Sequence, residues 1–313
     1  MAATKTDLTT DVLPPTSTAW RGITAPVAVC LGLLYFIWGS TYLAIRYVVQ
    51  VLPAMTTGGV RFLIAGGFLL LLLVIGGRHA LPTRRQWLAS IPGGLLLFML
   101  GNGLVALGEM HVSSSATVVL IATMPLFATL IAAAMGERTS RRQWTGLGVG
   151  FLGILVMGIG DMGGSPQWLL LLLVAAACWA LGTNLARKLP LPPGMMAAAT
   201  QMTVGGVAML LAGLVLGERM PETPLSELPH QALLAFAYLI VFGSLVAFSA
   251  YTYLLRHAPP SVATSYAYVN PLVGVAFGIV IGHERVGVST PIAAVLVVLG
   301  VVFIMTGKKP RVT

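Results

Sequence analysis

The chain has 313 residues, of which 57% are hydrophobic and only 9% charged, and its net charge is +9. Soluble domains contain about 25% charged residues, so this composition excludes a soluble globular protein and indicates an integral membrane protein. Cys30 and Cys178 both fall in apolar runs. The sequence therefore indicates neither a disulfide framework nor a zinc site, and we expect no metal and no cofactor.

Residues 1–24 lack apolar periodicity and are predicted to form a mobile cytoplasmic tail. A cleaved signal peptide is not expected, because the first apolar run starts late, is about 20 residues long and has no small-residue cleavage site after it. Ten apolar stretches follow, each close to the 20 or so residues that cross about 30 Å of hydrocarbon. They lie near residues 25–45, 55–76, 87–108, 113–135, 143–160, 167–186, 196–216, 231–254, 261–281 and 287–307.

The distribution of Lys and Arg predicts how these spans are oriented. With a cytoplasmic N-terminus, 14 of the 18 Lys and Arg residues fall in inner segments, Arg61 falls within a span, and only Arg46, Arg219 and Arg285 fall outside. Cytoplasmic segments of membrane proteins are enriched in Lys and Arg, so we expect both termini in the cytoplasm. The same distribution accounts for the positive net charge without a nucleic-acid partner.

The second half of the chain repeats the first. Ala122–Arg138 and Tyr268–Arg285 are both apolar runs that contain a proline and end in Gly, Glu and Arg, and Trp38–Arg46 corresponds to Trp179–Arg187. Internal repeats of this kind are typical of secondary transporters.

The number of spans determines how the two copies are related. Residues 25–160 and 161–308 would each contain five spans, and because five is odd, the second copy must cross the membrane in the opposite sense. Two inverted repeats suit alternating access, with a substrate site between the halves near the bilayer midplane. The sequence therefore predicts an all-α membrane protein of ten helices in two inverted five-helix repeats.

Several motifs resemble the EamA-domain proteins of the drug/metabolite transporter superfamily. They are the WGSTYLA segment that begins at Trp38, the Arg-Phe pair at Arg61, the two proline-to-Gly-Glu-Arg runs and the glycine-rich fifth span; the resemblance covers about residues 28–308. Within the superfamily, Gly101–Glu109 is similar to the YedA-like exporters. This resemblance implies ten helices, no ATP-binding domain, and efflux of small metabolites or drugs across the inner (plasma) membrane.

The two copies differ at an inserted His283 and at Gln201, which stands where the first copy has Arg61. We therefore expect the halves to be functionally unequal. The candidate residues of the central cavity are the polar and aromatic residues within the spans. They are Trp38, Ser40, Thr41, Arg61, Asn102, Trp179, Thr183, Asn184, Gln201, Tyr251, Tyr268 and Asn270.

Each of these residues also has a purely structural interpretation. Trp38 and Trp179 occupy matching positions in the repeats, and a buried indole N–H needs a hydrogen-bond partner, for which neighbours such as Ser40 and Thr183 are candidates. Packing between helices would explain the tryptophans equally well. Single amides within spans are often hydrogen bonds between helices and nothing more.

Arg61 is the one cation within a span, and an arginine at that depth should face a partner or water. Glu109, at the outer end of the third span, lies at a suitable depth to be that partner. The alternatives are an Arg61 that binds a substrate carboxylate and a Glu109 that carries protons. Pro125 and Pro271 are predicted helix kinks, because each removes an amide donor and frees a carbonyl one turn back. Such bends serve either packing or the cavity wall.

Glu137 and Glu284 end the fourth and ninth spans, each with an arginine next to it. Inversion places them on opposite sides of the membrane. We interpret both as exposed charges that terminate helices rather than as parts of a substrate site.

Secondary transport is the function that these observations favour. The chain has no G-x-x-x-x-G-K-[ST] motif, no G-x-S-x-G and no H-E-x-x-H, which argues against ATP hydrolysis and against an intramembrane enzyme. No filter sequence or ring of charges indicates a channel. We expect export of amino acids, related metabolites or drugs, with proton coupling an open question. Uptake of a nucleobase, vitamin or amine is the alternative, and both a monomer and a homodimer remain open.

Overall fold

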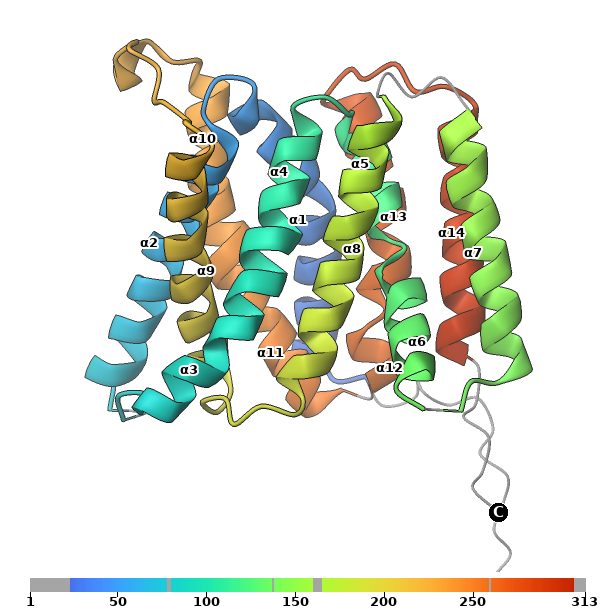
Figure 1. Cartoon of the computed structure of the whole chain (residues 1–313), viewed down its shortest axis with the longest axis horizontal. Coiled ribbons are helices and arrows are strands. Elements are labelled where there is room, and N and C mark those ends of the chain that lie inside the picture. The colour runs from blue at the N-terminus through green and yellow to red at the C-terminus, as the bar shows by residue number, and fades with distance from the viewer. Residues whose placement is uncertain (1–22, 78–79, 137, 160–164, 259, 307–313) are drawn as a thin grey trace, which may run out of the picture.

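The structure is a computed structural model, and it describes residues 23–77, 80–136, 138–159, 165–258 and 260–306 (Figure 1). Within these ranges the regular structure is entirely helical, which confirms the predicted all-α fold. Most of the predicted tail, 1–24, and the whole of Glu137 lie outside the described residues.

The helices of the first half follow the order of the predicted spans. They are α1 (Ala25–Val49), α2 (Ala54–Ile75), α3 (Arg84–Gly93), the π-helical η1 (Gly94–Asn102), α4 (Gly103–Glu109), α5 (Ser114–Ile121), α6 (Met124–Ala134) and α7 (Arg141–Ile159). The second half repeats this order. Its helices are α8 (Pro166–Ala186), α9 (Met195–Val215), the 3-10 turn η2 (Leu225–Glu227), α10 (His230–Tyr238), the π-helical η3 (Leu239–Val246), α11 (Ala247–His257), α12 (Pro260–Ala263), α13 (Tyr266–Val280) and α14 (Ser289–Thr306).

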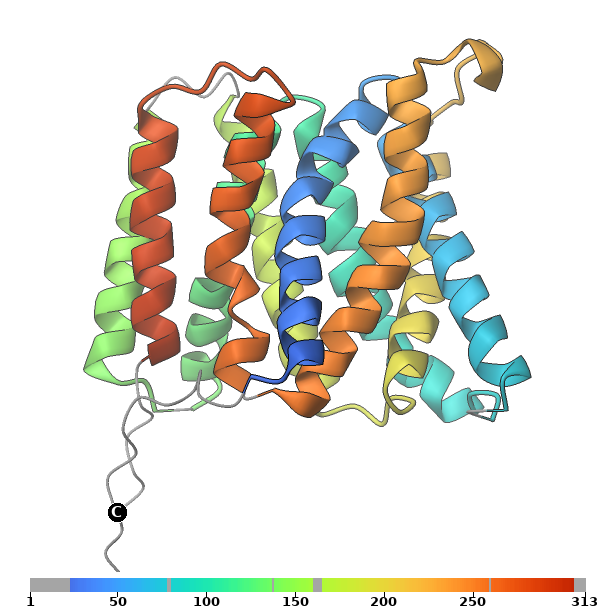
Figure 2. The same ribbon diagram turned by 180° about the vertical axis from the view of Figure 1, so that it is seen from behind.

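Each of the ten predicted ranges is helical in the described part of the chain. Eight continuous helical stretches are long and apolar enough to cross a membrane, and α13 is a shorter apolar helix. The one remaining predicted range corresponds to α7, which begins with two arginines and lies alongside α14 (Figures 1 and 2). Two of the stretches are composite, because α3, η1 and α4 form one span, as do α10, η3 and α11.

The two halves run in opposite directions. In Figure 1, α1 begins at the lower end of the bundle whereas α8 begins at the upper end and descends. Equivalent helices pair across the halves, α2 with α9 on one side and α7 with α14 on the other. A Cβ built on Gly59 would lie 2.9 Å from the carbonyl oxygen of Gly206, and the reverse distance is also 2.9 Å. These two glycines therefore let α2 and α9 approach backbone to backbone.

The lower end of the bundle in Figure 1 holds the start of α1 and the end of α14. Most described Lys and Arg residues outside the membrane core lie at the same end, in the segments around the starts of α3 and α7 and the ends of α8 and α11: Arg84, Arg85, Arg138, Arg141, Arg142, Arg187, Lys188 and Arg256. Arg46, Arg219 and Arg285 lie in segments at the opposite end. We refer to these two ends below as the predicted inner and outer ends.

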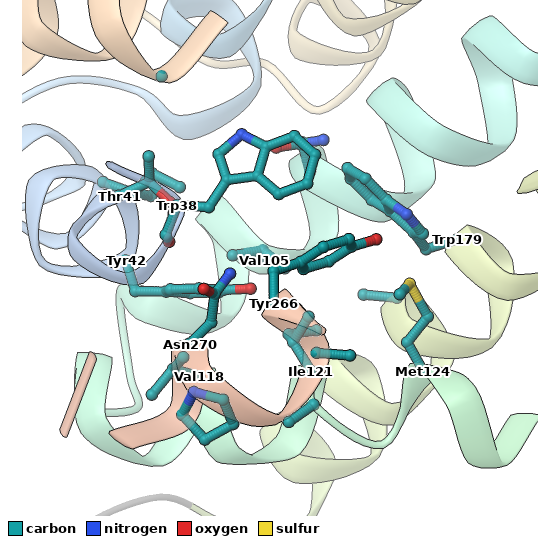
Figure 3. A pocket seen from close by; sticks show the side chains of 18 of the residues that line it. Trp38, Thr41, Tyr42, Val105, Val118, Ile121, Met124, Trp179, Tyr266 and Asn270 are labelled. Carbon is teal, nitrogen blue, oxygen red and sulfur yellow. Dashed lines mark hydrogen bonds between the residues drawn. The ribbon is translucent and has the colours of Figure 1, made fainter. Parts of the chain in front are cut away.

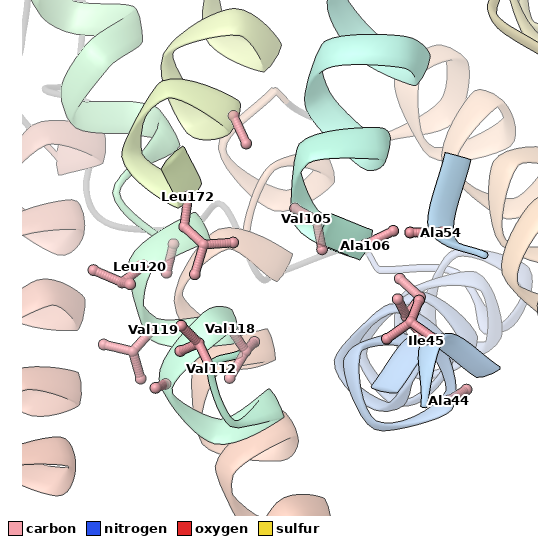
Figure 4. Packing of buried hydrophobic residues seen from close by; sticks show 14 of the residues in the cluster. Ala44, Ile45, Ala54, Val105, Ala106, Val112, Val118, Val119, Leu120 and Leu172 are labelled. Carbon is pink, nitrogen blue, oxygen red and sulfur yellow. The ribbon is translucent and has the colours of Figure 1, made fainter. Parts of the chain in front are cut away.

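The largest apolar core lies toward the predicted outer end. It joins α1, α4, α5 and α8, with Ile45, Val105, Val118 and Leu172 among its buried residues (Figure 4). Figure 2 shows α1 lying between α13 and α11. The central helices are thus packed tightly in the outer half of the molecule.

The two repeats differ in how their proline-containing spans are interrupted. In the first, the helix breaks at Ala122 and Thr123, directly before α6, whose second residue is Pro125. In the second, α13 continues through Pro271, and the break falls earlier, between α12 and α13. The prediction of a kink at each proline therefore matches a helix break only at Pro125.

Candidate functional site

A cavity of about 90 Å³ lies at the centre of the bundle and is lined by both repeats. Figure 3 shows side chains from α1, α4, α5, α8 and α13 converging on it. Six predicted cavity residues line it, together with both predicted prolines: Trp38, Thr41, Arg61, Asn102, Trp179, Asn270, Pro125 and Pro271. The structure thus brings together residues that are more than 200 positions apart.

Trp38 and Trp179, the matching tryptophans of the two repeats, both face this cavity (Figure 3). Trp38 packs edge-on against Tyr266, with ring centroids 5.0 Å apart, and against Phe248 at 5.3 Å. A Cβ on Gly101 would lie 2.9 Å from the Trp179 ring, so the absence of a side chain at this position leaves room for the indole beside η1. The tryptophans form aromatic walls on two sides.

The hydroxyls expected to pair with these indoles bond elsewhere. Ser40 donates to the Ile37 carbonyl and shares a 2.7 Å hydrogen bond with the Tyr238 hydroxyl. Thr41 donates to the carbonyl of Trp38, one turn back on its own helix, at 2.7 Å. Hydroxyls in helices readily bond to a carbonyl three or four residues earlier, which is why proximity in sequence did not identify an indole partner.

Arg61 is the only charged residue among the described side chains that line the central cavity. It is 6% exposed, and its Nε donates to the Ser244 hydroxyl of η3 at 2.9 Å. This geometry corrects the predicted ion pair with Glu109, because the ion pair found in the described ranges joins Arg46 to Glu284 instead. The approach of α2 to η3 gives Arg61 a neutral partner from the other repeat.

Two amides supply further polar groups to the cavity. Asn270 of α13 is 8% exposed, and its Oδ1 has no hydrogen-bond partner in the described part of the chain. Asn102 also lines the cavity, and its Nδ2 donates to the Leu97 carbonyl at 3.0 Å. Unpartnered buried acceptors are costly without a ligand or water.

The other predicted residues lie outside the central cavity. Gln201 packs against Gly93 of α3, and Tyr268 packs on the main apolar core. Tyr251 lies behind Trp38 and Tyr266, with ring centroids at 5.3 and 5.7 Å, and so supports the cavity wall. These positions follow from the rotation of each helix, which the sequence does not reveal for nearly uniform apolar spans.

Sequence reasoning missed several lining residues, of which Tyr42, Phe248, Tyr266 and Met124 are the largest. For Tyr42, the spacing of residues along the helix could have predicted its position. Trp38, Thr41, Tyr42 and Ile45 are spaced at i, i+3, i+4 and i+7, the pattern of a single helix face, and all four line the cavity.

A second cavity, of about 320 Å³, lies between α6, α7, α8 and α14 and extends toward the predicted inner end. Thr183, Asn184 and Arg187 line it. Met124 and Pro125 line both this cavity and the central one, so the two cavities adjoin at the first turn of α6. We call the second cavity the inner vestibule.

At the predicted outer end, Glu284 joins the two repeats. Its carboxylate accepts hydrogen bonds from the backbone N–H groups of Ser114 and Ser115 at 2.8 and 3.0 Å, and from their hydroxyls at 2.8 and 2.5 Å. Arg46 lies 3.7 Å away and donates to the carbonyls of Glu109 and Val112. Glu284 is therefore a cap on the N-terminus of α5, not the exposed helix-terminating charge that we predicted.

The local backbone explains how Glu284 reaches α5. His283, the residue inserted in the second copy, has a φ of 50°, and this left-handed conformation turns the chain back over the end of α13. A Cβ on Gly278 would lie 2.6 Å from Glu284 Oε2, so only glycine fits there. Burial alone would raise the pKa of Glu284, but the hydrogen bonds from Ser115 and Ser114 outweigh it and hold the pKa below its ordinary value.

Glu109, at the end of α4, has a fully buried side chain. Neither carboxyl oxygen has a hydrogen-bond partner among the described residues. Arg46 contacts its backbone carbonyl and not its carboxyl group. Groups of three or more His, Cys, Asp or Glu that could hold a metal ion do not occur in the ranges that the structure describes.

Comparison with known proteins identifies transporters as relatives of this chain. The sequence model of the EamA-like transporter family matches residues 26–159 and, separately, 166–306. The uncharacterized inner membrane transporter YedA of Escherichia coli K12 is 39% identical over 285 residues, covering 90% of this chain and 92% of YedA. The uncharacterized transporter YvbV of Bacillus subtilis is 25% identical and covers 91% of this chain and 93% of its own. A solved crystal structure with 17% identity matches with a TM-score of 0.59 over 88% of this chain and 95% of that one, which shows the shared fold.

Proposed function

This chain belongs to the EamA-like transporter family, and we propose that it is a secondary transporter of the inner membrane that exports small metabolites, such as amino acids and related compounds, or drugs. Export proceeds by alternating access of the central cavity to the two sides. The location follows the similarity to YedA, an inner membrane transporter by name. Export is the direction that the family resemblance favours.

The position of the central cavity carries this proposal. It lies between two inverted repeats and receives Trp38 from one and Trp179 from the other. Movement of one repeat against the other would change which end of the cavity is open. A few polar groups set in apolar and aromatic walls are the usual composition of a small-molecule site.

The unequal closure of the two ends supports alternating access. The cap formed by Glu284 on α5 and the apolar core around Ile45 and Val118 lie between the cavity and the predicted outer end. On the other side, the cavity adjoins the inner vestibule at the first turn of α6. This arrangement supports a state that is closed at the predicted outer end.

A comparison of strains tests the proposal. A deletion strain and an overexpressing strain would be grown with amino acids, amino-acid analogues and lipophilic cations, and the medium would be analysed for secreted metabolites. We expect the overexpressing strain to resist at least one compound and to accumulate it outside the cell. Identical growth and identical media in both strains would contradict export, whereas faster intracellular accumulation on overexpression would indicate uptake of a nucleobase, vitamin or amine.

A further inference from the structure

The charge of the central cavity restricts what it can bind. Arg61 is the only charged residue among its described lining side chains, and it is 6% exposed. A buried cation without a countercharge is expensive within a membrane, and such residues commonly lie on substrate pathways. The cavity therefore carries one positive charge that the described residues do not neutralise.

The orientation of Arg61 leaves its terminal nitrogens available to a ligand. The Nε is engaged by the Ser244 hydroxyl at 2.9 Å, which fixes the plane of the guanidinium. The terminal nitrogens have no hydrogen-bond partner in the described part of the chain, and a Cβ on Gly243 would lie only 3.1 Å from Nη2. Because Gly243 also lines the cavity, this edge of the guanidinium lies at the cavity wall.

A planar guanidinium with two free terminal nitrogens matches a carboxylate, which it can bind through paired hydrogen bonds. One arginine balances one negative charge. A phosphate ester carries up to two charges and would leave one of them unpaired in an apolar site, so the cavity is better suited to a monoanion. The aromatic rings of Trp38, Trp179 and Tyr266 supply surface for an apolar or aromatic body.

Asn270 adds a second point of recognition. Asn270 lines the cavity, and its Oδ1 is buried and has no partner among the described residues. An amide oxygen accepts hydrogen bonds and cannot donate them. The complementary group on a ligand is therefore a donor, such as an ammonium, amide or hydroxyl group.

We propose that the transported solutes carry one carboxylate on a compact apolar or aromatic body, with Arg61 binding the carboxylate and Asn270 accepting a hydrogen bond from a donor on the same solute. This inference rests on the proposed function and narrows its substrate class. It excludes organic cations without a carboxylate as preferred substrates. Free aromatic or branched amino acids and hydroxy acids have the required chemistry.

Four probes that share a phenyl ring separate the two contacts. They are 3-phenylpropionate with a carboxylate only, phenethylamine with an ammonium only, phenylalanine with both, and phenylalaninol with the carboxylate replaced. Binding to the purified full chain would be measured by calorimetry and by the shift in thermal unfolding. We expect affinity in the order phenylalanine, 3-phenylpropionate, and then the two probes that lack a carboxylate.

Single substitutions test which residue contacts each group of the probes. Arg61→Gln should weaken binding of the carboxylate probes by about ten- to a hundredfold, the value of a hydrogen bond to a charged group, and should not weaken phenethylamine. Ser244→Ala keeps the charge of Arg61 but removes the hydrogen-bond partner of its Nε, and it should weaken binding of the carboxylate probes less. Asn270→Leu should affect phenylalanine more than 3-phenylpropionate. Arg219→Gln removes an exposed charge and serves as the matched control.

Unchanged binding of the carboxylate probes to Arg61→Gln would overturn the proposal, as would equal binding of phenethylamine and 3-phenylpropionate or failure of all four probes to bind at millimolar concentrations. If Arg61→Gln does not fold, the probe series on the native protein and on Ser244→Ala still decides the outcome. Counterflow in proteoliposomes separates this inference from the proposed function. Transport of phenethylamine without transport of carboxylates would reject the inference alone, whereas the strain comparison tests export itself.

Discussion

Glu284→Gln should open the predicted outer end of the transporter. The carboxylate of Glu284 accepts four hydrogen bonds from Ser114 and Ser115 on the other repeat. Glutamine keeps one acceptor oxygen and places an NH₂ group against the two donors that used the second oxygen. The substitution therefore weakens a contact that exists only when this end is closed.

The size of the effect follows from this contact. Loss of a cap at a helix N-terminus costs about 1–2 kcal/mol, and a hydrogen bond to a charged group contributes about 1.5–3 kcal/mol. We take about 2 kcal/mol as the net change in the closed state. At 1.4 kcal/mol per factor of ten, the ratio of open to closed molecules should rise about 30-fold.

A cysteine behind the contact reports this ratio. Thr117 is fully buried in α5, and Cys30 and Cys178 can be replaced by alanine to leave Thr117→Cys as the single thiol. The rate of labelling by a membrane-impermeant maleimide, added from the outer side of oriented vesicles, should increase about 30-fold with Glu284→Gln. An unchanged rate would refute the argument that this contact keeps the outer end closed.

Glu218→Gln is the matched control. Glu218 also accepts hydrogen bonds at a helix N-terminus, from the backbone of Met55 and Thr56 in α2, but this contact lies in the peripheral pair of α2 and α9. We expect it to leave labelling at Thr117→Cys unchanged. An equal acceleration would show that loosening any contact at the outer surface is enough to speed labelling of Thr117→Cys.

The Glu284 contact should depend on pH in a defined direction. Hydrogen bonds hold the pKa of Glu284 below its ordinary value, so this contact is fully present above that ordinary value and is lost as the pH falls through the lowered pKa. Maleimide reacts with the thiolate, so labelling of Thr117→Cys is compared at each pH with labelling of an exposed thiol. This ratio should rise only at a pH below the ordinary glutamate range, about 4.3. It should show no such rise when Glu284 is glutamine, since that side chain does not titrate.

Three further predictions concern other parts of the molecule. If Glu109, buried with unpartnered oxygens, carries protons, Glu109→Gln should abolish flux driven by a pH gradient in proteoliposomes and retain exchange without a gradient; unaltered proton dependence would exclude this role. Trp38→Ala removes one aromatic wall of the cavity and should reduce transport at least tenfold, which corresponds to a loss of about 1.4 kcal/mol of binding, whereas Phe36→Ala, on the exposed face of the same helix, should retain it. Gly59→Ala, whose Cβ would lie 2.9 Å from a backbone oxygen of α9, should lower thermal stability by about 1–3 kcal/mol, while Gly148→Ala, which faces open space, should not lower it.

The sequence contained most of the information about the scaffold. Apolar stretches of membrane length and the internal repeat depend on local composition and on spacing along the chain, and both can be read without coordinates. They predicted the helical ranges and the inverted relationship between α1 and α8 that the structure has. The helical period of Trp38, Thr41 and Tyr42 would also have identified one wall of the cavity.

The partners of individual polar side chains depended on the tertiary structure. Arg61 bonds to Ser244, 183 residues away, rather than to the predicted Glu109, and Glu284 bonds to Ser114, 170 residues away. In spans that are apolar on almost every side, composition does not determine how each helix is rotated about its axis. Only the packing of one repeat against the other determines which polar groups face the cavity, which bond to their own helix and which join the two halves.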